Sequence, residues 1–138
     1  MGAVDQIKQM IAAKNFDPKQ FPLFIQAMQE ISQRNTDLQQ ELSNVENTSI
    51  NFTIPNVVNG FLKIEGGKLT GGEGNVADAP LTIEIAEHVA KGMITGESDI
   101  ASAYMAGDVK LIGDMAEAMK LRPIFEIVNQ ELGISSGS

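Results

Sequence analysis

The chain has 138 residues, of which 43% are apolar and 20% are charged, as expected for one globular domain with a core of its own. Its formal net charge of −8 disfavours nucleic acid as a partner, because phosphate binding needs a basic surface, and it also disfavours adsorption onto anionic membranes. The absence of cysteine excludes disulfides, thiolate nucleophiles and cysteine-ligated metals.

The first part of the chain, residues 1–45, is predicted to be helical. Apolar residues at helical spacing indicate an amphipathic helix over residues 3–14, and Pro22 marks the start of a second helix. The second helix carries a regular apolar stripe, for which we favour packing on the core over lipid binding: Phe21, Phe24, Ile25, Met28 and Ile31. Thr36 and Gln39 form a capping box that opens a short third helix.

From Ser49 onward the apolar period changes to two, which predicts strands. The inward-facing residues are Ile50, Phe52 and Ile54 in the first strand, Leu62 and Ile64 in the second, Leu81, Ile83 and Ile85 in the fourth, and Val109 and Leu111 in the fifth. Gly66 and Gly67 form a hairpin turn into a third strand, from Lys68 to about Val76. Because the third strand is rich in glycine, we expect it at an edge or a bulge of the sheet.

Two helices are predicted between the fourth and fifth strands. The first spans residues 86–95 and closes at Gly96, where a glycine adopts the left-handed conformation without a Cβ clash. Ser98 caps a short second helix that ends at Gly107.

After the fifth strand, Gly113 turns the chain and Asp114 with Glu117 makes an acidic capping box for another helix. Pro123 is expected to start a final helix, which Gly133 ends. The whole chain, 1–138, is therefore predicted to be a single α+β domain with a five-stranded, mainly antiparallel sheet and helices over one face. Residues 134–138 are expected to be a frayed tail.

No catalytic or metal-binding constellation stands out in the sequence. His88 is the only histidine, whereas a zinc site needs three or four ligands and a hydrolytic triad needs a nucleophile with an oriented base. The glycine run from Gly66 to Gly74 lacks the Gly-Lys-Ser/Thr ending of a phosphate-binding loop, so hairpin glycines explain it better. We expect no enzyme activity, no cofactor and no metal.

The stretch from Met93 to Leu121 carries a recognisable succession of residues. Its elements are the Ile94–Gly96 turn, then Ala103, Tyr104 and Gly107, then the strand ending at Gly113, then Met115, Ala118, Met119, Lys120 and Leu121, with the run from Ala77 to Ile85 upstream. This succession resembles the sterol carrier protein 2 (SCP2) sterol-transfer domain. The resemblance weakens over residues 46–76 and is only topological before them, and by helical segments the first ~18 residues are expected to be an addition to the minimal domain.

The resemblance implies an apolar tunnel between the sheet and the helices that takes in fatty acyl chains or sterols. The residues expected to line it are Met93, Ile100, Tyr104, Met105, Met115, Met119, Leu121, Ile124, Phe125 and Val128. Tyr104 is the candidate polar group in the wall, because its ring packs while its hydroxyl seeks a partner.

The function expected from the sequence is non-catalytic binding and carriage of a lipid, fatty-acyl or sterol-like ligand. The alternative is a structural or regulatory interaction module with a filled core, which self-associates as a homodimer or docks a partner through its N-terminal helices. We see no basic region with an apolar run that would mark a signal peptide, and no apolar stretch near the ~20 residues that span a bilayer. We therefore expect a cytoplasmic protein with at most transient membrane contact.

Overall fold

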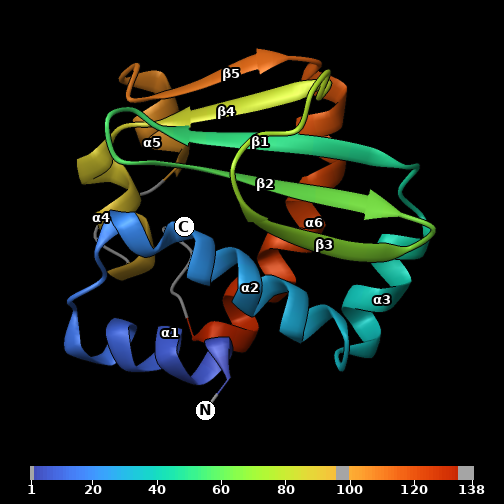
Figure 1. Cartoon of the computed structure of the whole chain (residues 1–138), viewed down its shortest axis with the longest axis horizontal. Helices are drawn as coiled ribbons and strands as arrows, with labels where there is room; N and C mark the ends of the chain where they lie inside the picture. The colour runs from blue at the N-terminus through green and yellow to red at the C-terminus, as the bar shows by residue number, and fades with distance from the viewer. Residues whose placement is uncertain (1, 96–99, 134–138) are drawn as a thin grey trace.

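The computed structural model describes the backbone of residues 2–95 and 100–133, and the side chains of residues 2–92 and 103–133 (Figure 1). Its helices are α1 (Ala3–Ala13), the 3-10 turn η1 (Pro18–Gln20), α2 (Phe21–Ser32), α3 (Thr36–Ser43), α4 (Glu87–Thr95), α5 (Ile100–Met105) and α6 (Met115–Leu132). Its strands are β1 (Thr48–Ile54), β2 (Val58–Glu65), β3 (Lys68–Glu73), β4 (Leu81–Ile85) and β5 (Val109–Gly113).

The five strands form one sheet in the order β3-β2-β1-β4-β5. Only β1 and β4 are parallel, and the other neighbours pair antiparallel, so the predicted α+β class with a mainly antiparallel sheet is confirmed. The predicted hairpin lies at Gly66 and Gly67, whose φ angles of 57° and 78° favour glycine. As expected, β3 is an edge strand, although it ends at Glu73 rather than near Val76.

One face of the sheet carries the core. Along β1, β2 and β4, buried residues alternate with half-buried or exposed ones, as strand geometry requires. In the view of Figure 1, α6 starts at the end of β5 and passes behind the strands toward α1 and α3, which it contacts together with α2 and β4. The helices therefore cover the apolar face of the sheet.

The apolar stripe of α2 is a core surface, as predicted, because all five of its residues are buried. Ile25 lies directly on the β2–β3 hairpin, where Gly60 and Gly71 leave room for it. A β carbon built at either glycine would come within 2.5 Å of the Ile25 side chain. The glycines of this region thus serve the close approach of a helix to the sheet.

The cap of α3 differs from the prediction by one residue. Asn35, not Thr36, is the N-cap: its Oδ1 accepts a hydrogen bond from the Leu38 N–H at 2.9 Å. Gln39 does not reach back to the cap, because its Nε2 donates to the Ser32 carbonyl at 3.1 Å. Asn35 has the extended backbone, with φ −91° and ψ 114°, that an N-cap residue needs.

The prediction that Pro123 starts a separate helix is wrong, because α6 is continuous from Met115 to Leu132 with Pro123 inside it. A proline in a helix interior costs about 3 kcal/mol through its missing N–H and the clash of its ring. Buried Leu121 and Ile124 on either side of it provide packing that offsets this cost. The predicted end at Gly133 is confirmed, with φ 75°. The predicted roles of Gly96 and Ser98 fall outside the described residues.

Candidate functional site

The position of α6 over the sheet is set by the turn that follows β5. Gly113 has φ 122°, and a β carbon there would collide with the Pro80 carbonyl, so only glycine fits this turn. The Asp114 N–H donates to the Pro80 carbonyl at 3.0 Å, which ties the start of α6 to the chain entering β4. The N-terminus of α6 is therefore held at the β4–β5 end of the sheet.

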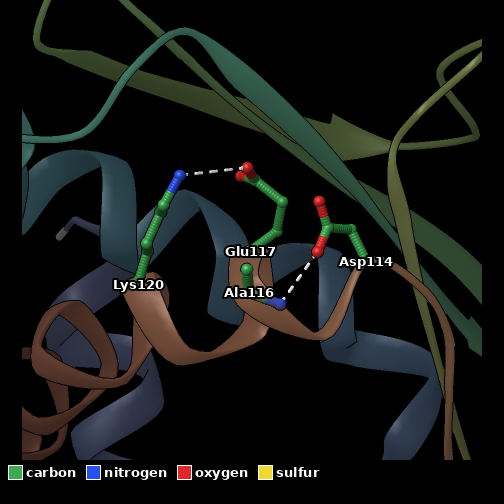
Figure 2. A network of polar contacts seen from close by, with 4 residues as sticks. All are labelled: Asp114, Ala116, Glu117 and Lys120. Atoms are coloured by element: carbon green, nitrogen blue, oxygen red, sulfur yellow. Dashed lines mark hydrogen bonds and ion pairs between the residues drawn. The ribbon is translucent and has the colours of Figure 1, made fainter.

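Asp114 caps α6, as the sequence predicted. Its Oδ1 accepts a hydrogen bond from the Ala116 N–H at 2.9 Å (Figure 2). The reciprocal half of the capping box is absent, because the Asp114 N–H is already bonded to Pro80. Glu117 instead pairs with the Lys120 ammonium at 3.4 Å along the helix surface.

The sheet supplies one apolar wall of the space beneath α6. Val109 and Leu111 of β5 stand opposite Ile85 and Ile83 of β4, so all four lie on the same face of the sheet. Ile83, Ile85 and Val109 are buried, with at most 6% of each side chain exposed. Leu111 packs against the same core but is only half-buried.

The α6 helix supplies the facing wall. Leu121, Ile124 and Val128 recur at helical spacing and are buried, with 1% or less exposed. Ala118 and Phe125, seven residues apart and so on one side of the helix, pack against the core but are only half-buried. Leu111 and Ala118 are thus half-buried near the β5 side of the sheet, and Phe125 is half-buried farther along α6, beside β1.

Aromatic rings close the middle of this space. The Phe125 ring meets the Phe52 ring of β1 edge-on, with centroids 6.2 Å apart and an interplanar angle of 88°. Phe52 in turn meets Phe21 of α2 at 5.3 Å, and Phe21 stacks on Phe24 at 5.7 Å. Edge-to-face and stacked pairs at these distances are the favourable arrangements for aromatic rings. This chain of rings links α2, the sheet and α6.

The residues predicted to line a tunnel fall into three groups. Leu121, Ile124 and Val128 are buried and Phe125 is half-buried, all on the sheet-facing side of α6. The second group is exposed, by 47% for Tyr104, 86% for Met105, 47% for Met115 and 75% for Met119. The side chains of Met93 and Ile100 lie outside the described residues. The structure therefore brings together the α6 members and leaves the exposed group at the surface.

Helical geometry explains the exposure of the two α6 methionines. Met115 and Met119 are four residues apart and share one face, which lies nearly opposite Leu121 and Val128. Although these methionines are close in sequence to the lining residues, they lie on a different side of α6. Tyr104 sits near the end of α5 and is exposed. It lies at the surface rather than inside a wall.

Leu111 and Ala118 belong to this site but were not among the residues predicted to line a tunnel. Both carry a signal that was available: Leu111 alternates with Lys110, and Ala118 lies seven residues before Phe125. Neither side chain carries a chemically distinctive group. Their significance comes from partial burial, which only the folded chain reveals.

Other polar features lie apart from this space. His88 is close to Asp108, with Nε2 and Oδ2 3.5 Å apart, and both side chains are substantially exposed. Among the described residues, no group of three or more histidines and carboxylates is arranged to hold a metal ion. No helix in the described ranges combines the length and apolarity of a membrane span.

The described residues also form two open hollows with mainly polar linings. One is lined by Ala3, Gln26, Gln29, Glu30, Gln33 and Gly71, and the other by Asn35, Asp37, Ile127, Gln130 and Glu131. Neither includes residues of β4 or β5, or Ala118 or Phe125 of α6, although half-buried Ile127 of α6 lines the second. They are therefore separate from the space between β5 and α6.

Solved structures with the same fold include a crystal structure of sterol carrier protein 2, with 20% identity and a TM-score of 0.59. The match covers 81% of this chain and 95% of that one. Sterol carrier protein 2 from Yarrowia lipolytica in its apo form matches with 15% identity and a TM-score of 0.57, covering 71% of this chain and 90% of that one. At these identities the likeness shows the fold alone.

The sec-alkylsulfatase Pisa1 from Pseudomonas sp. also matches, with 19% identity and a TM-score of 0.52 over 88% of this chain. The chain spans 17% of the length of that protein and 12% of the length of a double mutant of PisA1. No curated protein matches the chain significantly in sequence. A family profile does match, over residues 28–126. The chain therefore belongs to the SCP-2 sterol transfer family.

Proposed function

We propose that this protein binds and carries a lipid with an apolar chain, non-covalently and without catalysis, in the space between β5 and α6. Membership of the SCP-2 sterol transfer family supports lipid binding and transfer as the class of function. The ligand is proposed to be a fatty-acyl or sterol-like molecule. The cytoplasmic location remains a prediction from the sequence.

The observation that carries the proposal is partial burial on both walls of this space. Leu111 on the core face of β5, and Ala118 and Phe125 on one side of α6, pack against the core yet keep solvent exposure. In a close-packed interior such side chains would be fully covered, because core voids are small and few. An apolar chain lying beside them would complete their burial.

Hydrophobic transfer is sufficient to drive such binding. Each buried methylene contributes about 0.8 kcal/mol, so a chain burying ten of them gains roughly 8 kcal/mol before the costs of association are subtracted. Few polar contacts are then needed. Tyr104, exposed at the end of α5, is proposed to meet the polar end of the ligand, because its ring can pack while its hydroxyl stays near water.

The first experiment is native mass spectrometry of the purified protein, followed by organic extraction and lipid analysis. The expected result is an adduct of a few hundred daltons that extracts as a fatty acid or another lipid. An apo mass together with no uptake of a fluorescent fatty acid on titration would refute the proposal.

A matched pair of variants tests the location. Ala118 and Ala116 both lie in the first turns of α6, but Ala118 is half-buried toward the sheet and Ala116 is exposed. Ala118→Trp should fill the space and weaken uptake of a fluorescent fatty acid at least tenfold, whereas Ala116→Trp should bind like the wild type. Circular dichroism and thermal melting check that both variants are folded. Equal uptake by two folded variants would show that the ligand binds elsewhere.

The alternative, an interaction module with a filled core, is supported by the chain of rings from Phe24 to Phe125. These rings occupy the middle of the space between the sheet and the helices. In this alternative no ligand co-purifies, no probe is taken up, and Ala118→Trp destabilises the fold without a binding phenotype. The same two experiments therefore separate the two functions.

A further inference from the structure

The two edges of the sheet differ in how their backbone is covered. At the β3 edge, the Gly71 N–H donates to the Gln29 side-chain oxygen of α2 at 3.3 Å. Ile25 of the same helix packs on Gly71, so α2 lies along this edge. An edge strand covered in this way cannot easily accept another strand.

Within the described residues no helix side chain bonds to the β5 edge in this way, although α5 contacts β5. β5 is the last strand of the sheet, and Figure 1 shows it as the topmost strand, with its far side facing away from the other strands. The Ala86 N–H donates to the Asp108 carbonyl, and the Asp114 N–H donates to the Pro80 carbonyl. These two bonds determine which residues of β5 direct their backbone N–H and C=O groups toward β4. By antiparallel alternation, Val109 and Leu111 then direct their N–H and C=O groups outward. In the described part of the chain, nothing bonds to them there.

The side chains beside this open edge are also unusual for a sheet surface. Ile112 lies on the face opposite the core and is 53% exposed. Lys110, two residues before it on the same face, is exposed and makes no ion pair within the described residues. Asp114, two residues after Ile112, is exposed and uses one carboxylate oxygen as a helix cap. The edge therefore presents a cation and an apolar residue on the outer face of β5, and an anion directly after the strand ends at Gly113.

We propose that β5 pairs antiparallel with β5 of a second copy of this chain, which joins two sheets into one across a two-fold axis. In the proposed register Ile112 lies opposite the partner's Ile112, and Lys110 lies opposite the partner's Asp114. Leu111 then exchanges backbone hydrogen bonds with the partner's Gly113. This interface is independent of whether a lipid is bound.

Self-complementarity favours a second copy over an unrelated strand. A two-fold interface repeats each contact, so the contact between Lys110 and the partner's Asp114 forms twice, on either side of the Ile112 pair. Centring the pair on Lys110 opposes two ammonium groups, and centring it on Leu111 opposes Asp108 and Asp114, both of which are unfavourable like-charge pairs. Centring it on Val109 sets Lys110 opposite the partner's Asp108, but that carboxylate already lies 3.5 Å from the His88 imidazole.

Crosslinking tests the register directly, because the chain has no cysteine of its own. In the proposed pairing, position 112 forms a non-hydrogen-bonded pair with itself, with Cα atoms about 4.5 Å apart, which is within disulfide range. Ile112→Cys should therefore crosslink to a covalent dimer under mild oxidation. The matched control, Lys110→Cys, places its two thiols about 14 Å apart and should stay monomeric. Crosslinking of both variants at equal rates, or of neither, would overturn the register.

Sedimentation equilibrium over a concentration series tests the dimer without modification. The wild type should approach twice the chain mass of 14.8 kDa, and its dissociation constant should rise with salt. Lys110→Glu should raise the dissociation constant of the dimer at least tenfold, because the new carboxylate would face the partner's Asp114. Lys63→Glu makes the same charge change on β2, away from the edge, and should leave it unchanged. A wild type that stays at 14.8 kDa at all concentrations would overturn the proposal.

Discussion

Replacing Gly71 by alanine should destabilise the protein strongly, although the change adds a single methyl group. A β carbon at this position would lie 2.5 Å from Ile25 Cγ2 and 3.1 Å from Leu62 Cδ2, and it would collide with the Phe61 carbonyl oxygen. Carbon atoms in ordinary contact are about 3.5–4.0 Å apart. Either α2 or the β2–β3 hairpin must therefore move by about an ångström.

The magnitude follows from the nature of these neighbours. Overpacking a core costs about 1–3 kcal/mol, and the upper end applies here because one of the neighbours is backbone, which cannot rotate away. A loss of about 3 kcal/mol corresponds to a fall of roughly 10 °C in Tm for a domain of this size. The measurement is urea unfolding followed by circular dichroism, with Tm from a thermal scan.

Gly72 provides a matched control in the next position of the same strand. Its nearest neighbour to a built β carbon is Phe61 Cε1 at 3.9 Å, which is ordinary contact. Gly72→Ala should be neutral or up to about 1 kcal/mol more stable, because alanine lowers the entropy of the unfolded chain. If Gly71→Ala and Gly72→Ala unfold within about 0.5 kcal/mol of each other, the packing of α2 on the hairpin has been misread.

Two further variants examine α6. Asp114→Ala should lower the free energy of unfolding, measured in urea, by about 1 kcal/mol, because the Ala116 N–H loses its cap. Asp114→Asn should retain most of the wild-type stability, because asparagine can also cap a helix. Equal losses in the two variants would contradict a capping role. Phe125→Ala should cost about 2 kcal/mol, since the ring is only half-buried, and should raise the affinity for a bulky fluorescent sterol relative to a fluorescent fatty acid by widening the space beside Phe52. An unchanged ratio would place the ligand away from Phe125.

Local patterns in the sequence were sufficient to predict most of the fold. Alternation located β1, β2, β4 and β5, and Gly66 and Gly67 located a hairpin, because side-chain period and turn chemistry are properties of a few neighbouring residues. The stripe on α2 was correctly assigned to the core. Errors arose where two signals competed, as at Pro123. Proline is typical of a helix start, but packing of the residues on both sides of Pro123 keeps α6 continuous.

The site was less predictable than the fold. The resemblance to sterol carriers pointed to the right family and to the sheet-facing residues of α6, such as Ile124 and Val128. It also pointed to Met105 and Met119, which the structure leaves exposed. A methionine suits a core, a ligand cavity or a surface equally, because its flexible side chain adapts to each. Composition therefore cannot say which of these a given methionine occupies.

The sequence by itself determined the order of the strands, the cap of α6 at Asp114, and the family to which the chain belongs. These depend on short-range periodicity and on local side-chain to backbone bonds. Only the tertiary structure decided which face of α6 meets the sheet, which residues of the two walls are half-buried, and which sheet edge lies against α2. Such features depend on contacts between residues far apart in sequence, such as Phe52 with Phe125 and Gln29 with Gly71, and no local pattern encodes them.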